Sequence, residues 1–140
     1  MSDTFLDRFI KAQNSDYEIA LSEIKEGRKR SHWIWYIFPQ FKAFAHSRIA
    51  DYYGIGDKDE AETFLQHPVL GQRIREISIA LLHHKSKDIN EIFGELDAGK
   101  VRSCMTMFDY LSPNDVFGQV LDTFYGGKRG GRTLKVLNGV

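Results

Sequence analysis

The sequence has little of several features that mark particular classes of protein. It contains one cysteine, Cys104, in 140 residues, which excludes an internal disulfide framework and favours a reducing compartment. Its 19 basic and 19 acidic residues cancel, so no overall field favours nucleic acid or an anionic membrane as a partner. The first residues include acids and no long apolar run, which predicts neither a signal peptide nor a membrane span. We therefore expect a cytoplasmic protein that binds neither nucleic acid nor membranes.

The length of the chain fits one folding unit. A chain of this size buries roughly 68% of its unfolded surface on folding, which is enough for one self-sufficient core. The sequence has only three prolines and shows no internal repeat and no long linker. We therefore expect a single helical domain over residues 1–140.

Helical spacing of apolar residues dominates the chain, and no segment alternates between apolar and polar residues as a strand does. The expected fold is all-α, a compact single-domain bundle of short helices. Residues 5–10 favour a first helix, and Ser15 with Glu18 forms a capping box that predicts the start of a second. The clearest amphipathic pattern covers residues 70–81.

Capping residues and glycines predict where the other helices begin and end. In the first half of the chain we expect a helix from Ser47 to Tyr53 and another from Asp57 or Asp59 to the residue before Pro68. A Ser86-capped turn to Phe93 and a helix over residues 101–111 follow. The last two are a helix from Pro113 to Phe124, which Gly126 and Gly127 end, and a short helix over residues 134–137.

Six of the eighteen aromatic residues lie within residues 33–44. Each large apolar side chain gains about 1.5–3 kcal/mol on burial, so these rings form either the centre of the core or the wall of a pocket. Core packing is the default, but polar side chains interleave with the rings as in aromatic-lined ligand sites. Pro39 predicts a short buried helix or extended turn that ends at Phe38. The candidate wall residues are His32, Trp33, Trp35, Tyr36 and Gln40.

A second candidate feature is the segment 126–133, which combines four glycines with three cations. Glycines let backbone amides converge, and a helix start follows, so this segment can hold a phosphate. The candidate anion ligands are Lys128, Arg129 and Arg132. The alternative is a plain loop in which glycines end a helix. A further basic run at 28–30 either contributes to the same pocket or complements a helix dipole.

Acid–base candidates are less specific. Asp97, Lys100 and Ser103 or Cys104 follow at three- and four-residue spacing and so share one helical face. Lys100 and Ser103 have the spacing of a Ser–Lys pair, and Cys104 is a candidate nucleophile. The simpler interpretation is an Asp–Lys ion pair beside a small buried cysteine. No catalytic residue is assigned, and the sequence leaves open whether the protein is an enzyme.

The five histidines lack the spacings of a metal site, since adjacent His83 and His84 point to different helix faces. We expect neither a metal nor a cofactor. His32, beside the aromatic run, is the candidate proton donor or acceptor, with an ordinary hydrogen-bonding role as the alternative. His67, before Pro68, is interpreted as a turn residue.

Several segments together resemble a small uncharacterised bacterial family of compact, mainly helical proteins, sometimes mislabelled calpastatin. The matching segments are residues 31–40, 67–71, 92–94, 103–108 and 133–134. The resemblance covers essentially the whole chain and implies a helical fold. Members of the family carry an Asp shortly before the Thr-Leu step, where this chain has Gly130 and Gly131. The resemblance implies no activity.

Two functions from different classes follow from these features. The first is a small-molecule binding protein or enzyme, whose aromatic segment walls a pocket and whose basic glycine segment closes over an anionic, nucleotide-like ligand. The second is a protein-interaction module without a small-molecule site, in which the rings are core and the basic segments are solvated. The positions of Tyr36, Gln40 and Arg132 discriminate, because only the first function needs them around one cavity.

Overall fold

The computed structural model describes residues 4–139 of the chain. Within that range the secondary structure is helical, apart from one isolated parallel bridge between Phe41 and Ile55. The elements are α1 (Thr4–Glu26), α2 (Ile34–Ile37), the 3₁₀ helix η1 (Lys42–Phe44), α3 (Arg48–Tyr52), α4 (Lys58–Gln66), α5 (Pro68–Leu82), α6 (Ile89–Phe93), α7 (Glu95–Leu111), α8 (Val116–Tyr125) and α9 (Gly131–Leu137). The all-α prediction is confirmed.

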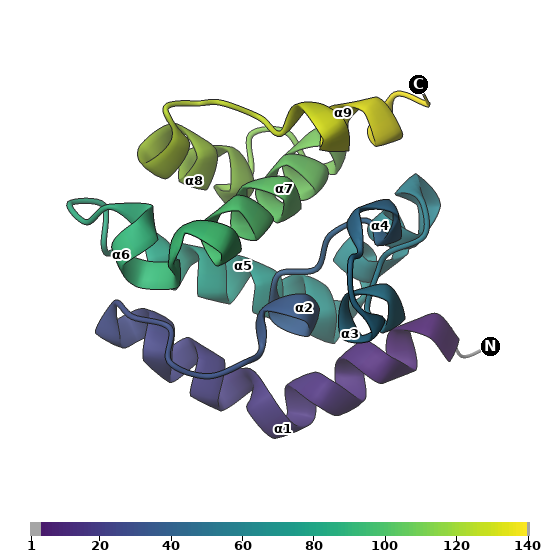
Figure 1. Cartoon of the computed structure of the whole chain (residues 1–140), viewed down its shortest axis with the longest axis horizontal. Helices are drawn as coiled ribbons and strands as arrows, with labels where there is room; N and C mark the ends of the chain where they lie inside the picture. Colours follow the sequence, from purple (N-terminus) through teal and green to yellow (C-terminus); the bar gives the residue numbers. More distant parts are fainter. Residues whose placement is uncertain (1–3, 140) are drawn as a thin grey trace.

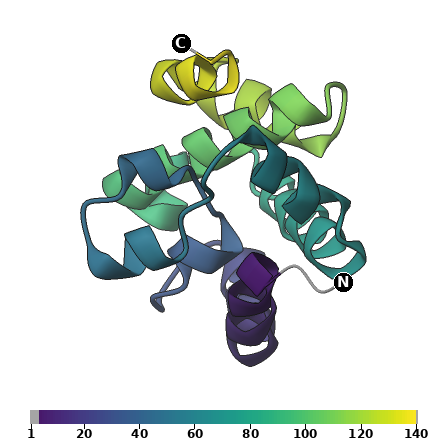
Figure 2. The same cartoon turned by 90° about the vertical axis from the view of Figure 1, so that its right-hand side faces the viewer.

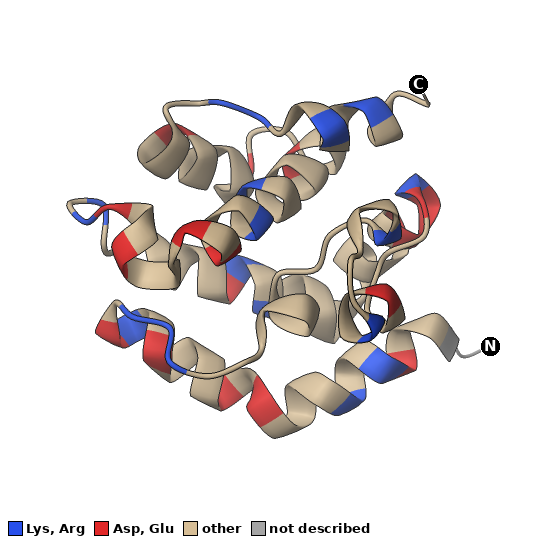
Figure 3. Cartoon of the chain, in the orientation of Figure 1, with Lys and Arg blue, Asp and Glu red and all other residues tan. Residues whose placement is uncertain are grey.

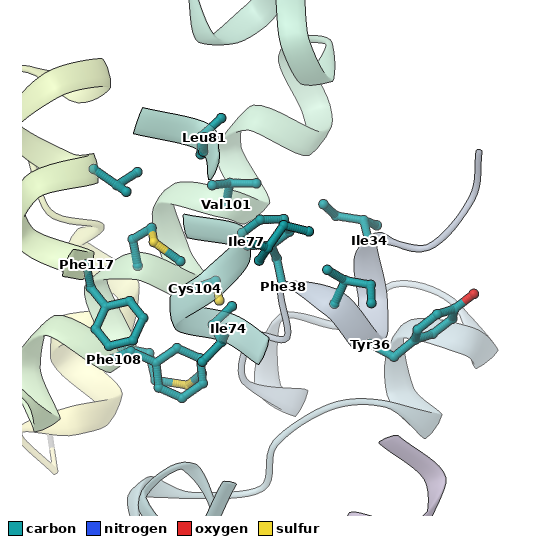
Figure 4. Packing of buried hydrophobic residues seen from close by; sticks show 14 of the residues in the cluster. Ile34, Tyr36, Phe38, Ile74, Ile77, Leu81, Val101, Cys104, Phe108 and Phe117 are labelled. Atoms are coloured by element: carbon teal, nitrogen blue, oxygen red, sulfur yellow. The ribbon is translucent and has the colours of Figure 1, made fainter. Parts of the chain in front are cut away.

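Two long helices, α5 and α7, form the centre of the arrangement (Figure 1). Helix α5 packs against α1, α4 and α8, and helix α7 packs against α4, α6, α8 and α9. Their facing sides carry a close-packed apolar cluster, part of which Figure 4 shows around Ile77, Cys104 and Phe108. Such packing fixes the position and axial rotation of α7, and therefore which of its side chains face α9.

Helix α1 is continuous, and the predicted break at Ser15 and Glu18 is wrong. Both residues are exposed on the outer face of the helix, and their capping-box pattern goes unused. Buried residues recur every three or four positions on both sides of that point, so one continuous face packs against the core and favours an unbroken helix. These residues are Leu6, Phe9, Gln13, Tyr17, Ala20 and Ile24.

Several predicted helix ends are confirmed by side-chain contacts. The Ser47 hydroxyl accepts a hydrogen bond from the backbone N–H of Ala50 at 3.2 Å and begins α3. The Asp57 carboxylate accepts one from the N–H of Glu60 at 2.9 Å and begins α4. Gly126 ends α8 in the left-handed conformation, with φ of 60°, which glycine adopts without strain.

Two predicted starts lie too early, by two residues for α6 and by three for α8. Asp88 rather than Ser86 begins α6, because its carboxylate and that of Glu91 form a capping box. Helix α8 begins after Asp115, while Pro113 lies in the preceding turn. In both cases an aspartate competes with a weaker start signal nearby.

The segment between α2 and α4 lies on the outside of the molecule, as the two views in Figures 1 and 2 agree. It contains η1 and α3, and no residue from 42 to 53 is buried. This outer segment, 42–53, forms one side of the candidate site.

Candidate functional site

A cleft of about 360 Å³ lies where the chain around residues 40–46, the first half of α7 and the start of α9 meet. These three segments are far apart in sequence, and the packing of α7 against α9 brings two of them together. The cleft is lined by Gln40, Phe44, His46, Leu96, Gly99, Lys100, Arg102, Ser103, Gly130, Gly131, Arg132 and Thr133. Its volume is within the range of small-molecule sites.

The charge of the cleft has one sign. Lys100, Arg102 and Arg132 all line it, together with His46, and the described lining includes no carboxylate. Figure 3 shows basic residues on the middle turns of α7 and on α9, whereas Glu95 and Asp97 lie on the first turn of α7 and Asp109, which pairs with Arg129, lies near its end. Cations gathered in a concave, partly dry site attract an anion more strongly than the same cations on an open surface.

Hydroxyl groups gather beside Gly130 at the base of the cleft. The Thr106 hydroxyl donates to the carbonyl of Arg102 at 2.7 Å and accepts the backbone N–H of Gly130 at 3.0 Å, which fixes the start of α9 on α7. A Cβ at position 130 would lie 3.4 Å from the Thr133 hydroxyl oxygen and 3.8 Å from that of Ser103. Because residue 130 is a glycine, there is space at this position next to three hydroxyl groups.

Two buried polar atoms at the cleft have no hydrogen-bond partner within residues 4–139. They are Nε of Arg102 and the hydroxyl oxygen of Thr133, and Thr133 is only 1% exposed. Leaving a buried polar group unpaired costs about 1–3 kcal/mol, so such groups are rare in folded proteins. Both atoms lie beside the cleft but are shielded from it by the surrounding side chains.

The ammonium of Lys100 is held by a charge network on the first turns of α7. Its Nζ lies 3.2 Å from Oδ1 of Asp97, and the other oxygen of Asp97 lies 3.0 Å from Nζ of Lys29. The two cations also stack on neighbouring rings, Lys29 over Trp33 at 5.2 Å and Lys100 over Trp35 at 5.7 Å from the centroid. The basic run at 28–30 thus reaches the cleft only indirectly, through Asp97.

Arg132 closes one end of the cleft by contacting the opposite wall. Its guanidinium carbon lies 4.6 Å from the centroid of the Phe44 ring. A planar guanidinium over an aromatic face leaves its N–H groups at the edge, where they remain able to bind an anion.

A narrow aromatic slot adjoins the cleft. It is lined by Ile34, Trp35, Phe38, Gln40, Phe41, Ala45, Ala50, Tyr53 and Lys100, and it has about 10 Å³ of free space. Gln40 and Lys100 line both the slot and the cleft, so the two spaces share a boundary.

The structure brings together only some of the candidate residues from the sequence. Arg132 and Gln40 line the cleft, and Trp35 lines the adjoining slot with Gln40. Tyr36 lines neither space: it is 7% exposed, and its hydroxyl donates to the carboxylate of Asp16 on α1. Burial and this hydrogen bond raise the pKa of Tyr36 above its usual range. Of the three residues expected around one cavity in a small-molecule site, Gln40 and Arg132 therefore lie there and Tyr36 does not.

Trp33 is part of the core rather than of the cleft lining. It is 1% exposed, and its indole N–H donates to Oε1 of Glu23 at 3.0 Å. Glu23 also accepts the backbone N–H groups of Arg30 at 2.7 Å and Ser31 at 2.9 Å, and the Ser31 hydroxyl at 2.5 Å. Burial alone would raise the pKa of Glu23, but these hydrogen bonds outweigh it and lower that pKa to about 2. Glu23 therefore anchors the segment that leads into the aromatic run.

The remaining candidates lie away from the cleft lining. His32 is exposed beside that anchor, and Lys128 is exposed in the turn before α9. Arg129 pairs with Asp109 at 3.1 Å and lies 3.6 Å from Asp122. These carboxylates already compensate the charge of Arg129.

Sequence reasoning missed several cleft residues. The sequence marks Lys100 and Ser103 as a Ser–Lys spacing, with an Asp97–Lys100 ion pair as the simpler interpretation, and that ion pair is present. The sequence does not single out Arg102 or His46. The shared helical face of Lys100 and Ser103 was the available signal, but only the docking of α9 shows that it lines a cleft. Cys104 points into the core, where burial raises the pKa of its thiol well above the usual range and makes it a poor nucleophile.

Two further classes of site are absent from the part of the chain that the structure describes. No three His, Cys, Asp or Glu side chains of residues 4–139 lie close enough together to hold a metal ion. Over the same residues, every helix is too short or too polar to traverse a lipid bilayer.

Comparison with known proteins places this fold in a class of small helical proteins with no assigned activity. The chain belongs to the family described as protein of unknown function DUF1810, whose model matches residues 3–137. A similar crystal structure is that of the conserved hypothetical protein Rv1873 from Mycobacterium tuberculosis. The two sequences are 38% identical, the match covers 97% of this chain and 99% of that one, and the TM-score is 0.93. No curated protein matches this chain.

Proposed function

We propose that this protein binds an anionic, nucleotide-like small molecule in the cleft between α7, α9 and the segment around residues 40–46. The observation that carries the proposal is the gathering of Lys100, Arg102 and Arg132 around one concave space whose described lining includes no carboxylate. Lys100 already pairs with Asp97, so a bound phosphate or phosphate ester would mainly compensate the charges of Arg102 and Arg132.

The roles of the lining residues follow from their chemistry. Arg132 and Arg102 present planar guanidinium groups that suit the paired oxygens of a phosphate, and Lys100 supplies a point charge. Ser103 and Thr133 provide hydroxyl donors beside the space at Gly130.

The test is a thermal-shift screen of the purified protein against nucleotides, sugar phosphates and dinucleotide fragments, repeated on Arg132→Ala. A ligand at about a hundred times its Kd adds about 2.7 kcal/mol of stability. For a chain of this size that is a rise in Tm of roughly 10 °C. We expect this rise with at least one phosphate-bearing compound in the wild-type protein and its loss in Arg132→Ala.

Lys135→Ala is the matched control, because it removes one positive charge from the same helix at an exposed position outside the cleft lining. A ligand-induced shift that both variants lose equally would reflect general charge rather than the cleft. No shift with any compound would contradict the proposal and favour the alternative, a protein-interaction module, to be pursued by partner capture.

A further inference from the structure

The aromatic slot next to the cleft has the chemistry of a second subsite. Trp35, Phe38, Phe41 and Tyr53 supply its rings, and Gln40 and Lys100 stand where it opens to the cleft. Its free space of about 10 Å³ holds about one water molecule. Anything larger has to displace a wall.

One wall of the slot is packed loosely enough to move. Ala45, Ala50 and Tyr53 belong to the outer segment 42–53, none of whose residues is buried. The ion pair inside it is weak: Nζ of Lys42 lies 3.9 Å from a carboxylate oxygen of Asp51, and both side chains are more than half exposed. The rest of the lining belongs to α2, to residues 38–41 and to α7.

Both ends of the outer segment are anchored, so it can swing outward without changing the fold. At one end the Lys42 N–H donates to the Ile55 carbonyl at 2.8 Å and the Ile55 N–H to the Gln40 carbonyl at 3.0 Å. At the other end the Arg8 guanidinium donates to the carbonyl of Gly54 at 3.0 Å. Gly54 is required here, because a Cβ would lie 2.5 Å from the Cα of Lys42. Phe44 packs on Arg132, and Tyr53 packs on Phe9 and Tyr36. Movement is therefore confined to residues 45–51 between them.

We infer that the ligand is a nucleotide whose aromatic base enters this slot against Trp35 while its phosphate stays among the cations of the cleft. Residues 45–51, which carry the slot residues Ala45 and Ala50, move outward to admit the base. This inference rests on the proposed function, because it requires one ligand to occupy both the cleft and the slot, which meet at Gln40 and Lys100.

An aromatic base fits the slot better than a sugar or an aliphatic chain. A flat π-face stacks on tryptophan and phenylalanine rings without any particular hydrogen bond. The amide of Gln40 carries both a donor and an acceptor at the mouth of the slot, where it can meet the polar edge of a base.

The experiment compares adenosine monophosphate with ribose 5-phosphate, which has the same phosphate and sugar but no base. We expect the nucleotide to bind roughly ten- to a hundredfold more tightly, as stacking of one base allows. We also expect it alone to change tryptophan fluorescence, and we expect Trp35→Phe, which keeps Trp33 in the core, to abolish that change.

A blocking variant provides the second readout. Ala50→Leu fills the slot and should lower the affinity for adenosine monophosphate to that for ribose 5-phosphate, leaving the latter unchanged. Ala43→Leu is the matched control, because this exposed residue lies in the same segment but does not line the slot. Circular dichroism and the retained affinity for ribose 5-phosphate show that the variants are folded.

Each outcome decides between the two claims. The slot is not the site of the base if the two compounds bind equally tightly, or if adenosine monophosphate does not change the fluorescence of Trp35. The same conclusion follows if the nucleotide binds more tightly than ribose 5-phosphate and Ala50→Leu does not reduce that difference. In those cases the proposed phosphate site in the cleft would still stand. Binding of neither compound would overturn the proposed function, and the inference with it.

Discussion

The carboxylate of Glu23 is expected to contribute a large, pH-dependent share of the stability. Glu23→Gln keeps the shape of the side chain and removes its charge. The pKa of Glu23 is about 2 in the folded chain against 4.5 in the unfolded one, and this difference corresponds to at most about 3.5 kcal/mol at neutral pH. The residue is only 7% exposed, so solvent screens this contribution little.

The sign of the pH dependence follows from the depressed pKa. The contribution is complete above pH 4.5 and is lost as the pH falls toward 2, reaching about 1.4 kcal/mol at pH 3. The difference in unfolding free energy between wild type and Glu23→Gln should therefore shrink by more than half between pH 7 and pH 3.

The assay is urea denaturation followed by tryptophan fluorescence at several pH values. Glu26→Gln is the control, because this exposed residue pairs only with exposed Arg30 and should change stability by less than about 0.5 kcal/mol. A Glu23→Gln effect that stays constant from pH 7 to pH 3, or one as small as that of the control, would refute the reasoning.

Two further predictions concern the helices around the core. Gly71→Ala should lower the unfolding free energy by about 1–3 kcal/mol, because a Cβ would lie 2.1 Å from the carbonyl oxygen of Leu65; Gly99→Ala, with nothing within 4 Å of its Cβ, should instead raise it by about 0.5–1 kcal/mol. Equal effects of the two substitutions in chemical denaturation would contradict the described packing of α4 on α5. Cys104 is buried, and burial raises the pKa of its thiol. It should react with a thiol reagent only as fast as the chain unfolds, and rapid labelling of the native protein would contradict the burial of Cys104 in the core.

Local signals in the sequence were sufficient for the fold class and for many of the helix ends. Ser47 and Asp57 act through their own side chains on backbone groups three residues away, so their effect can be read without tertiary structure. The break expected at Ser15 failed for the opposite reason. Burial of α1 along its whole length against the core outweighs a local capping pattern.

The site was harder to predict because it is assembled from distant segments. Trp33 and Trp35 are two positions apart, yet one is buried on Glu23 and the other lines the slot beside Lys100. Arg129 and Arg132 belong to one basic run, but Asp109 neutralises the first while the second faces the cleft. Composition marks such residues as candidate ligand contacts. Only the packing of α9 on α7 shows which of them line the cleft.

The most direct test of the cleft as a ligand site is a titration of the ¹⁵N-labelled protein with adenosine monophosphate, followed by its backbone amide resonances. Gly99, Gly130 and Gly131 line the cleft, and glycine amides are well resolved in such spectra. We expect these three resonances to shift in a saturable way, while that of Gly118, which lies beside Asp109 in a separate pocket, stays fixed. Unchanged cleft glycines at millimolar nucleotide, or shifts confined to residues outside the cleft, would contradict the account.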